Sequence, residues 1–109
     1  MSADIDILAS IKSCVKRRRI RWTYHINMRL KGRFIPREAI LSSMDAYEII
    51  EEYPKDKYLP SFLIYTKYRA DAIHILMAID SANDAVTIIT AYRPDRDEWE
   101  SDLKTRRRK

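Results

Sequence analysis

Glycine, cysteine and histidine are all scarce in this chain of 109 residues. Gly32 is the single glycine, so neither a P-loop nor a dinucleotide-binding fingerprint can be present. Cys14 is the single cysteine, which excludes an internal disulfide. His25 and His74 lie far apart and lack the paired spacing of a zinc site. The acidic residues also do not cluster beside the basic ones, so we predict no metal and no cofactor.

Long apolar runs are missing as well. The N-terminal stretch is too short in apolar length for a secretory signal and is interrupted by Asp4 and Asp6. No segment approaches the length of a membrane span. Because one free thiol suits a reducing compartment, we expect a cytoplasmic protein with no membrane partner.

The chain has enough apolar residues to fold. Hydrophobic residues make up 46% of it, and its length is typical of one domain with a thin core. We therefore expect a single domain over residues 1–109.

Basic residues dominate the charge, with a formal net charge of +5. They form three groups: Lys16–Arg19 with Arg21; Arg29, Lys31, Arg33 and Arg37; and Arg106–Lys109. Separated basic patches on a small domain favour a polyanion, usually RNA or DNA. The alternative is solubility and a frayed basic tail, which we favour for the last group taken alone.

Apolar periodicity predicts helices first and strands afterwards. Helices are expected over 3–18, 24–32 and 36–44, with Tyr24 and Met28 facing inward and Gly32 as a C-cap. A short extended segment fits 20–23. Strands are expected over 47–53, 59–68, 72–80 and 86–93, followed by a short helix over 95–106. This order predicts an α+β fold, with helices on one face of an antiparallel sheet of about four strands.

The last hairpin allows its register to be predicted. A five-residue loop over 81–85 would pair Asp80 with Val86, His74 with Tyr92, and Leu76 with Thr90. One face would then form the core, and it carries Ile73, Ile75, Met77, Ile79, Ile89 and Ala91. The other face would be exposed, and it carries His74, Leu76, Ala78, Ile88, Thr90 and Tyr92.

This exposed face suggests a catalytic site. His74 is an acid/base candidate, and Tyr92 can donate a proton or stack on a base. His25 and Arg29 lie four residues apart on one stripe of the second helix. Metal-free RNA cleavage fits these residue types, because RNA supplies its own 2′-OH nucleophile. The alternatives are an ordinary solvent-facing sheet for His74 and a helix-cap histidine for His25.

Two blocks of sequence carry a resemblance to a known family. The first runs from Tyr24 to Glu38, and the second comprises 73–80 and 88–95. Together with Trp99 and the terminal arginines, they resemble a family of small prokaryotic proteins catalogued as a domain of unknown function. That family is similar to the RelE/ParE toxin superfamily, near BrnT-type toxins. The resemblance covers residues 22–108, and the helix and basic run over 1–20 lie before it.

The resemblance implies a RelE-like fold and a toxin of a type II toxin–antitoxin module. Such toxins mostly cleave mRNA, often on the ribosome, so the implied partners are mRNA or the ribosome and a cognate antitoxin. We assign catalysis to His25, Arg29, His74 and Tyr92. We assign nucleic-acid contacts to Arg33, Thr90, Lys67, Arg93, Arg106 and Arg107.

Other functions remain open at this point. A ParE-like inhibitor of DNA gyrase shares the fold and needs no acid/base pair. A non-catalytic RNA- or DNA-binding module needs only the basic patches. The helix over 3–18 is a candidate for contact with an antitoxin or with a second copy, as in a homodimer.

Overall fold

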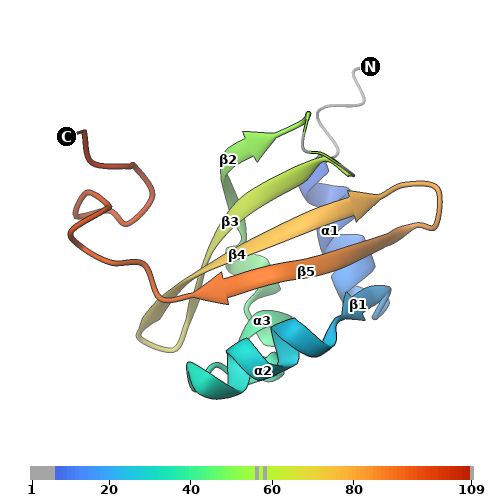
Figure 1. The fold of residues 1–109 in the computed structure, drawn as a ribbon, viewed down its shortest axis with the longest axis horizontal. Helices are drawn as coiled ribbons and strands as arrows, with labels where there is room; N and C mark the ends of the chain where they lie inside the picture. The colour runs from blue at the N-terminus through green and yellow to red at the C-terminus, as the bar shows by residue number, and fades with distance from the viewer. Residues whose placement is uncertain (1–6, 56, 58, 109) are drawn as a thin grey trace.

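The computed structural model describes residues 7–55, 57 and 59–108 (Figure 1). A five-stranded sheet has the order β1-β5-β4-β3-β2. The elements along the chain are α1 (Ile7–Lys16), β1 (Ile20–Trp22), α2 (Tyr24–Gly32), α3 (Arg37–Ser42), the 3₁₀ turn η2 (Met44–Ala46), β2 (Glu48–Tyr53), β3 (Ser61–Tyr68), β4 (Asp71–Asp80) and β5 (Ala85–Tyr92). The α+β class is confirmed.

The sheet is mixed, which corrects the prediction of a four-stranded antiparallel sheet. The short segment after α1 forms β1, which pairs in parallel with β5 through Ile20↔Val86 and Trp22↔Ile88. The backbone of Val86 also donates to the carbonyl of Arg19 at 3.0 Å. A strand of three residues is too short for a clear period-2 pattern, so its pairing could not be predicted from sequence.

One face of the sheet forms the core with the helices. The predicted apolar stripe of α1 is buried through Ile11, Cys14 and Val15. In α2 the buried residues are Ile26 and Leu30. The inward prediction for two other residues of that helix was wrong, since Tyr24 is 73% and Met28 51% exposed.

Local hydrogen bonds set the ends of α2. Thr23 is its N-cap, and the Thr23 hydroxyl accepts from the Ile26 N–H at 3.1 Å. Gly32 is the last helical residue, and Arg33 occupies the C-cap position predicted for Gly32. The predicted helix over 3–18 is observed as α1, and the predicted start of that helix lies outside the described residues. No helix in the described ranges is long and apolar enough to cross a membrane.

The β4–β5 register is confirmed at one end and wrong at the other. His74 pairs with Tyr92 and Leu76 with Thr90, but a bulge after Leu76 shifts the remainder, so that Asp80 pairs with Ala85. Consequently Ile88 is fully buried in the core and Ile89 is 38% exposed, the reverse of the predicted assignment.

Residues 94–108, here called the strap, do not form the predicted C-terminal helix. The strap turns back on itself through a bridge between Trp99 and Arg106. The carboxylate of Asp95 accepts from the Asp97 N–H, and that of Asp102 accepts from the Lys104 N–H. Such short-range bonds from aspartate side chains favour turns over a helix.

Candidate functional site

His74 lies beneath the strap, which corrects the prediction that it is exposed. Its side chain is fully buried. The Trp99 ring meets the imidazole edge-on with centroids 4.5 Å apart, and Tyr92 and Tyr65 pack at 5.4 and 6.2 Å. The strap therefore covers the face on which His74 and Tyr92 pair.

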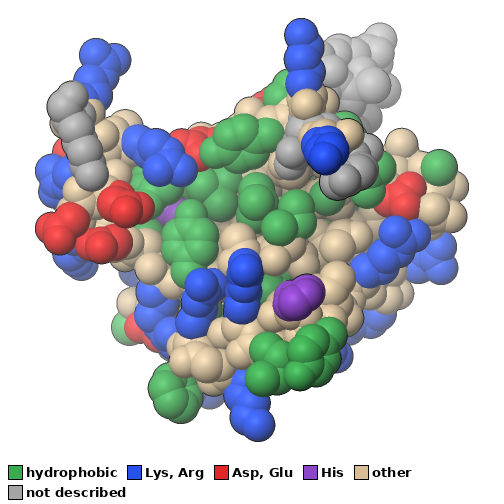
Figure 2. Space-filling view, viewed as in Figure 1, with side chains coloured by type: hydrophobic (Ala, Val, Ile, Leu, Met, Phe, Trp, Pro, Cys, Tyr) green, Lys and Arg blue, Asp and Glu red, His purple; other side chains and the backbone are tan. Residues whose placement is uncertain are grey.

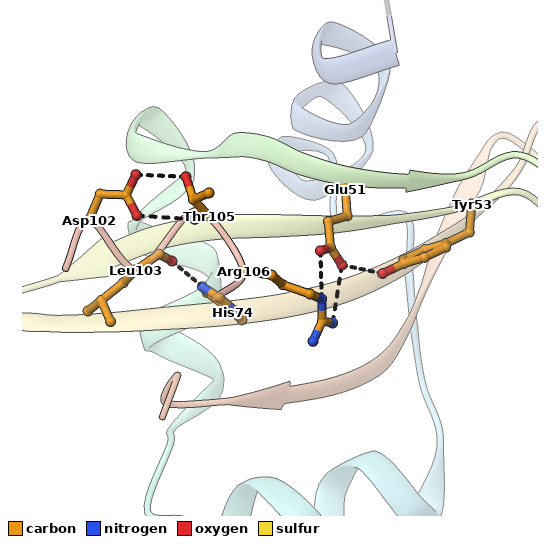
Figure 3. Close-up of polar contacts among 7 residues, drawn as sticks. All are labelled: Glu51, Tyr53, His74, Asp102, Leu103, Thr105 and Arg106. Carbon is orange, nitrogen blue, oxygen red and sulfur yellow. Dashed lines mark hydrogen bonds and ion pairs between the residues drawn. The ribbon is translucent and has the colours of Figure 1, made fainter. Parts of the chain in front are cut away.

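A hydrogen bond shows which nitrogen of His74 carries a proton. Its Nε2 lies 2.6 Å from the carbonyl oxygen of Leu103, which can only accept, so Nε2 carries the proton (Figure 3). The other nitrogen, Nδ1, is buried and has no hydrogen-bond partner among the described residues. Burial lowers the pKa of His74, although the Leu103 carbonyl and Glu51 oppose this effect. A neutral, covered imidazole cannot exchange protons with a substrate while the strap is in place.

The end of the strap is attached to β2 by charged groups. Arg106 Nε donates to Glu51 at 2.8 Å, and Tyr53 donates its hydroxyl proton to the same carboxylate (Figure 3). Burial raises the pKa of Glu51, but the hydrogen bonds from Arg106 and Tyr53 outweigh it and hold that pKa below its usual value. Lys104 forms a second ion pair with Glu48 at 3.0 Å.

Two strap arginines that we predicted to contact nucleic acid already have intramolecular hydrogen-bond partners. The Arg106 guanidinium bonds Glu51 and also lies over the Trp99 ring, 4.6 Å from its centroid. Arg107 donates to the carbonyl of Arg96 at 2.7 Å.

On α2, the predicted site residues His25 and Arg29 are both exposed. The side chains of Arg29 and Lys31 form no hydrogen bond or ion pair with any part of the chain that the structure describes. Figure 2 shows Lys and Arg side chains near a histidine over α2, in the lower part of this view. These groups are available to a ligand.

Arg33 and Arg93 fasten the end of α2 to the sheet. Arg33 donates to the Thr90 hydroxyl at 3.1 Å and to the Ala91 carbonyl at 2.7 Å. Arg93 donates to the Arg33 carbonyl at 2.6 Å and pairs with Asp71 at 3.4 Å. Lys67 and Arg93 line one pocket with Leu103 of the strap. Arg33 and Thr90 thus meet as a pair, in which the arginine holds the helix against β5.

The predicted catalytic set is divided between two places. His74 and Tyr92 lie together under the strap, whereas His25 and Arg29 lie on α2. No hydrogen bond, ion pair or ring contact joins the two pairs within the described ranges. Those ranges also contain no group of three or more His, Cys, Asp or Glu residues arranged to hold a metal ion.

Sequence reasoning missed the parts of the strap that enclose His74. Trp99 is 1% exposed and Leu103 supplies the carbonyl, while Glu51 anchors the strap from β2. The one available signal was a tryptophan in a polar tail, because a large apolar side chain there needs a surface to cover. Leu103 contributes only its backbone, which leaves no pattern in the sequence.

A comparison with protein families matches residues 22–93 to a domain of unknown function, DUF4258. No curated protein and no solved structure matches the chain. The matched segment runs from the end of β1 to the residue after β5, so the strap lies beyond it. Since the match spans more than half of the chain, this protein belongs to the DUF4258 family.

Proposed function

We propose that this protein is the toxin of a type II toxin–antitoxin module and cleaves mRNA without a metal ion. The observation that carries the proposal is the exposed face of α2, where His25 accompanies two cations that have no intramolecular partner, Arg29 and Lys31. No Asp or Glu occurs in the sequence between Asp6 and Glu38. An acid-free stretch around an exposed histidine suits a phosphodiester substrate.

The finer expectations about the fold and setting belong to the same proposal. A mixed sheet with helices on one face is compatible with a single RelE-like domain over residues 1–109, with its family core over 22–108. We also propose a cytoplasmic protein whose partners are mRNA, free or on the ribosome, and a cognate antitoxin.

The proposed chemistry uses the substrate's own 2′-OH. His25 accepts the hydroxyl proton as the new bond from the 2′ oxygen to phosphorus forms. The bond from phosphorus to the 5′ oxygen breaks, and that oxygen takes a proton from a protonated side chain or from water. Arg29 stabilises the extra negative charge on the phosphorane. While the strap covers them, His74 and Tyr92 take no part in this step.

Controlled expression in bacteria tests the proposal. The wild type should arrest growth and generate new RNA ends, and His25→Ala should lose both effects while its circular dichroism spectrum stays unchanged. Lys12→Ala, on α1, is a matched surface control and should behave as the wild type. Growth arrest and RNA cutting that persist in His25→Ala would contradict the assignment.

One observation favours a second function. Because His74 is buried and neutral, the chain has fewer accessible acid/base groups than its sequence indicates, which favours a non-catalytic RNA- or DNA-binding module. In that case the protein would bind RNA in a strongly salt-dependent way and leave it intact. Altered DNA supercoiling with intact mRNA would instead indicate a gyrase inhibitor.

A further inference from the structure

The strap is a separate layer on the sheet face opposite the helices. It begins after β5, beyond the segment shared with the family, and it returns over β3 and β4 to reach β2. Figure 1 shows it leaving the left end of β5 as a coil that belongs to neither helix nor sheet. The core cluster, which includes residues of α1, contains no residue of the strap.

The strap is held by one buried ring, by the hydrogen bond between His74 Nε2 and the Leu103 carbonyl, and by charges of opposite sign. Trp99 is its anchor against His74, at 4.5 Å between centroids. The remaining attachments to β2 are the ion pairs from Lys104 to Glu48 and from Arg106 to Glu51. In the second pair the Arg106 side chain is 53% and that of Glu51 22% exposed, so this attraction is partly screened and weakens with salt.

The closed arrangement also leaves a polar atom without a partner. His74 Nδ1 is buried and accepts no hydrogen bond from any described residue. Such a group loses its water on closure and gains nothing in return. Opening the strap would return Nδ1 to water, which offsets part of the cost of exposing Trp99 and of breaking the bond to Leu103.

We propose that the strap is a lid over His74 and Tyr92 that a polyanion opens by competing with Glu48 and Glu51 for Lys104 and Arg106. Phosphates offer these cations the same kind of charge-assisted hydrogen bond that the carboxylates provide. Arg108, which follows in the sequence, adds charge to the same end of the strap. Opening exposes a histidine paired with a tyrosine, with Tyr65 and Glu51 beside it.

This inference deepens the proposed function, because it names how RNA would control access to the second half of the predicted catalytic set. The polyanion is RNA in this proposal, because Arg29 and Lys31 of α2 give the chain further cations that have no partner among the described residues. Strap opening is a property of the chain that can be measured whether or not RNA is cut.

Hydrogen exchange followed by mass spectrometry tests the lid. The probe is a 2′-O-methyl RNA oligonucleotide, which lacks the nucleophilic hydroxyl and so stays intact. Bound RNA should increase exchange in peptides covering 94–108 and the strand around His74. Two backbone bonds within the strap, Glu100 N–H to Thr105 and Arg107 N–H to Glu98, report whether its own turn stays formed.

Two glutamates on β2 provide a matched pair of variants. Glu51→Gln should raise strap exchange by roughly threefold to fivefold without RNA, because it removes the ion pair with Arg106. Glu52→Gln is the control, since Glu52 forms no hydrogen bond or ion pair with the described part of the strap, and it should exchange as the wild type does. Trp99→Ala should leave the strap fully exchanged while the core strands stay protected.

Three results would contradict the proposal that the strap is a lid. The first is that the oligonucleotide does not bind, and the second is that it binds and strap exchange stays unchanged or falls. The third is equal strap exchange in the Glu51→Gln and Glu52→Gln variants. A strap that opens in the presence of natural RNA that remains uncut would uphold the lid and contradict the endoribonuclease proposal. The two failures are therefore distinguishable.

Discussion

At the scale of the single residue, His74 changes its role once its surroundings are known. The sequence places it opposite Tyr92, which the structure confirms. Its burial was not predictable, because Trp99 and Leu103 come from a segment whose sequence suggested a short helix. The face of the sheet on which a residue lies follows from the alternation of side chains along its strand. Whether that face is buried depends on segments distant in sequence, here the strap.

The burial of His74 predicts a pH-dependent stability. Its folded pKa lies below the unfolded value of about 6.5, so below that pH the unfolded chain binds the extra proton. Stability is present above the unfolded pKa and is lost as pH falls through the folded pKa. We expect the free energy of unfolding, measured with urea, to fall between pH 7.5 and 5, and His74→Gln to reduce this loss.

A side chain that does not titrate supplies the control for this measurement. Met28 on α2 is 51% exposed, so Met28→Gln should keep the pH dependence of the wild type. The account of His74 is wrong if His74→Gln and the wild type lose the same stability over this range.

At the scale of the element, the bulge in the β4–β5 pair decides which isoleucine enters the core. The hydrophobic pattern predicted Ile89 in the core, whereas Ile88 is buried there. The pattern could not decide between them, because either register places an isoleucine on each face. The bulge after Leu76 adds a residue to one strand and inverts the faces toward the turn. Periodicity therefore predicted the strands but could not reveal one extra residue within them.

Paired substitutions test the bulge. Ile88→Ala should cost about 2–5 kcal/mol of unfolding free energy, because Ile88 is fully buried. Ile89→Ala should cost well under that, roughly 0.5 kcal/mol, since Ile89 is 38% exposed. Urea unfolding of the two variants gives the comparison, and similar losses in both would contradict the observed register.

The N-terminus of α2 offers a second test at this scale. Thr23→Ala should cost about 0.5–2 kcal/mol, because it removes the acceptor for the Ile26 N–H. Thr23→Ser keeps the hydroxyl and should retain most of that stability. Thermal unfolding measures both, and a Thr23→Ala variant as stable as the wild type would show that the cap contributes nothing.

The helices show where sequence reasoning succeeds. The predicted range of 24–32 is the observed α2, because a capping threonine precedes it and a glycine ends it. The strap shows where such reasoning fails. Its conformation depends on aspartate turns and on the His74 surface, neither of which has a helical or strand period.

At the scale of the whole molecule, the basic residues near the two ends of the chain differ in their surroundings. The stretch between Asp6 and Glu38 contains no acidic residue. In the strap, Lys104 and Arg106 are paired with glutamates of β2. The net charge of +5 therefore understates the field at α2. Composition predicts a polyanion partner, and the structure adds which cations are free and which are paired.

RNA binding should show this division. Log affinity should fall linearly with log salt concentration, and Arg29→Ala or Lys31→Ala should each reduce the slope by about 0.7 if the cation contacts a single-stranded phosphate. Arg17 is already paired with Asp84 at 2.9 Å, so Arg17→Ala should change the slope less. Fluorescence anisotropy with a labelled oligonucleotide measures the three slopes, and an equal effect at all three positions would refute the assignment of α2 as the contact face.

The central claim is metal-free RNA cleavage through the 2′-OH with His25 as the acid/base group. It is tested most directly by incubating the purified protein with RNA, alone and on ribosomes, in the presence of a chelator, and by mapping the ends formed. We predict 2′,3′-cyclic phosphate ends, no cleavage after a single 2′-deoxy substitution at the cut nucleotide, and a loss of about 10²–10⁴-fold in His25→Ala. Cleavage of the 2′-deoxy substrate, or full activity in His25→Ala, would contradict this account.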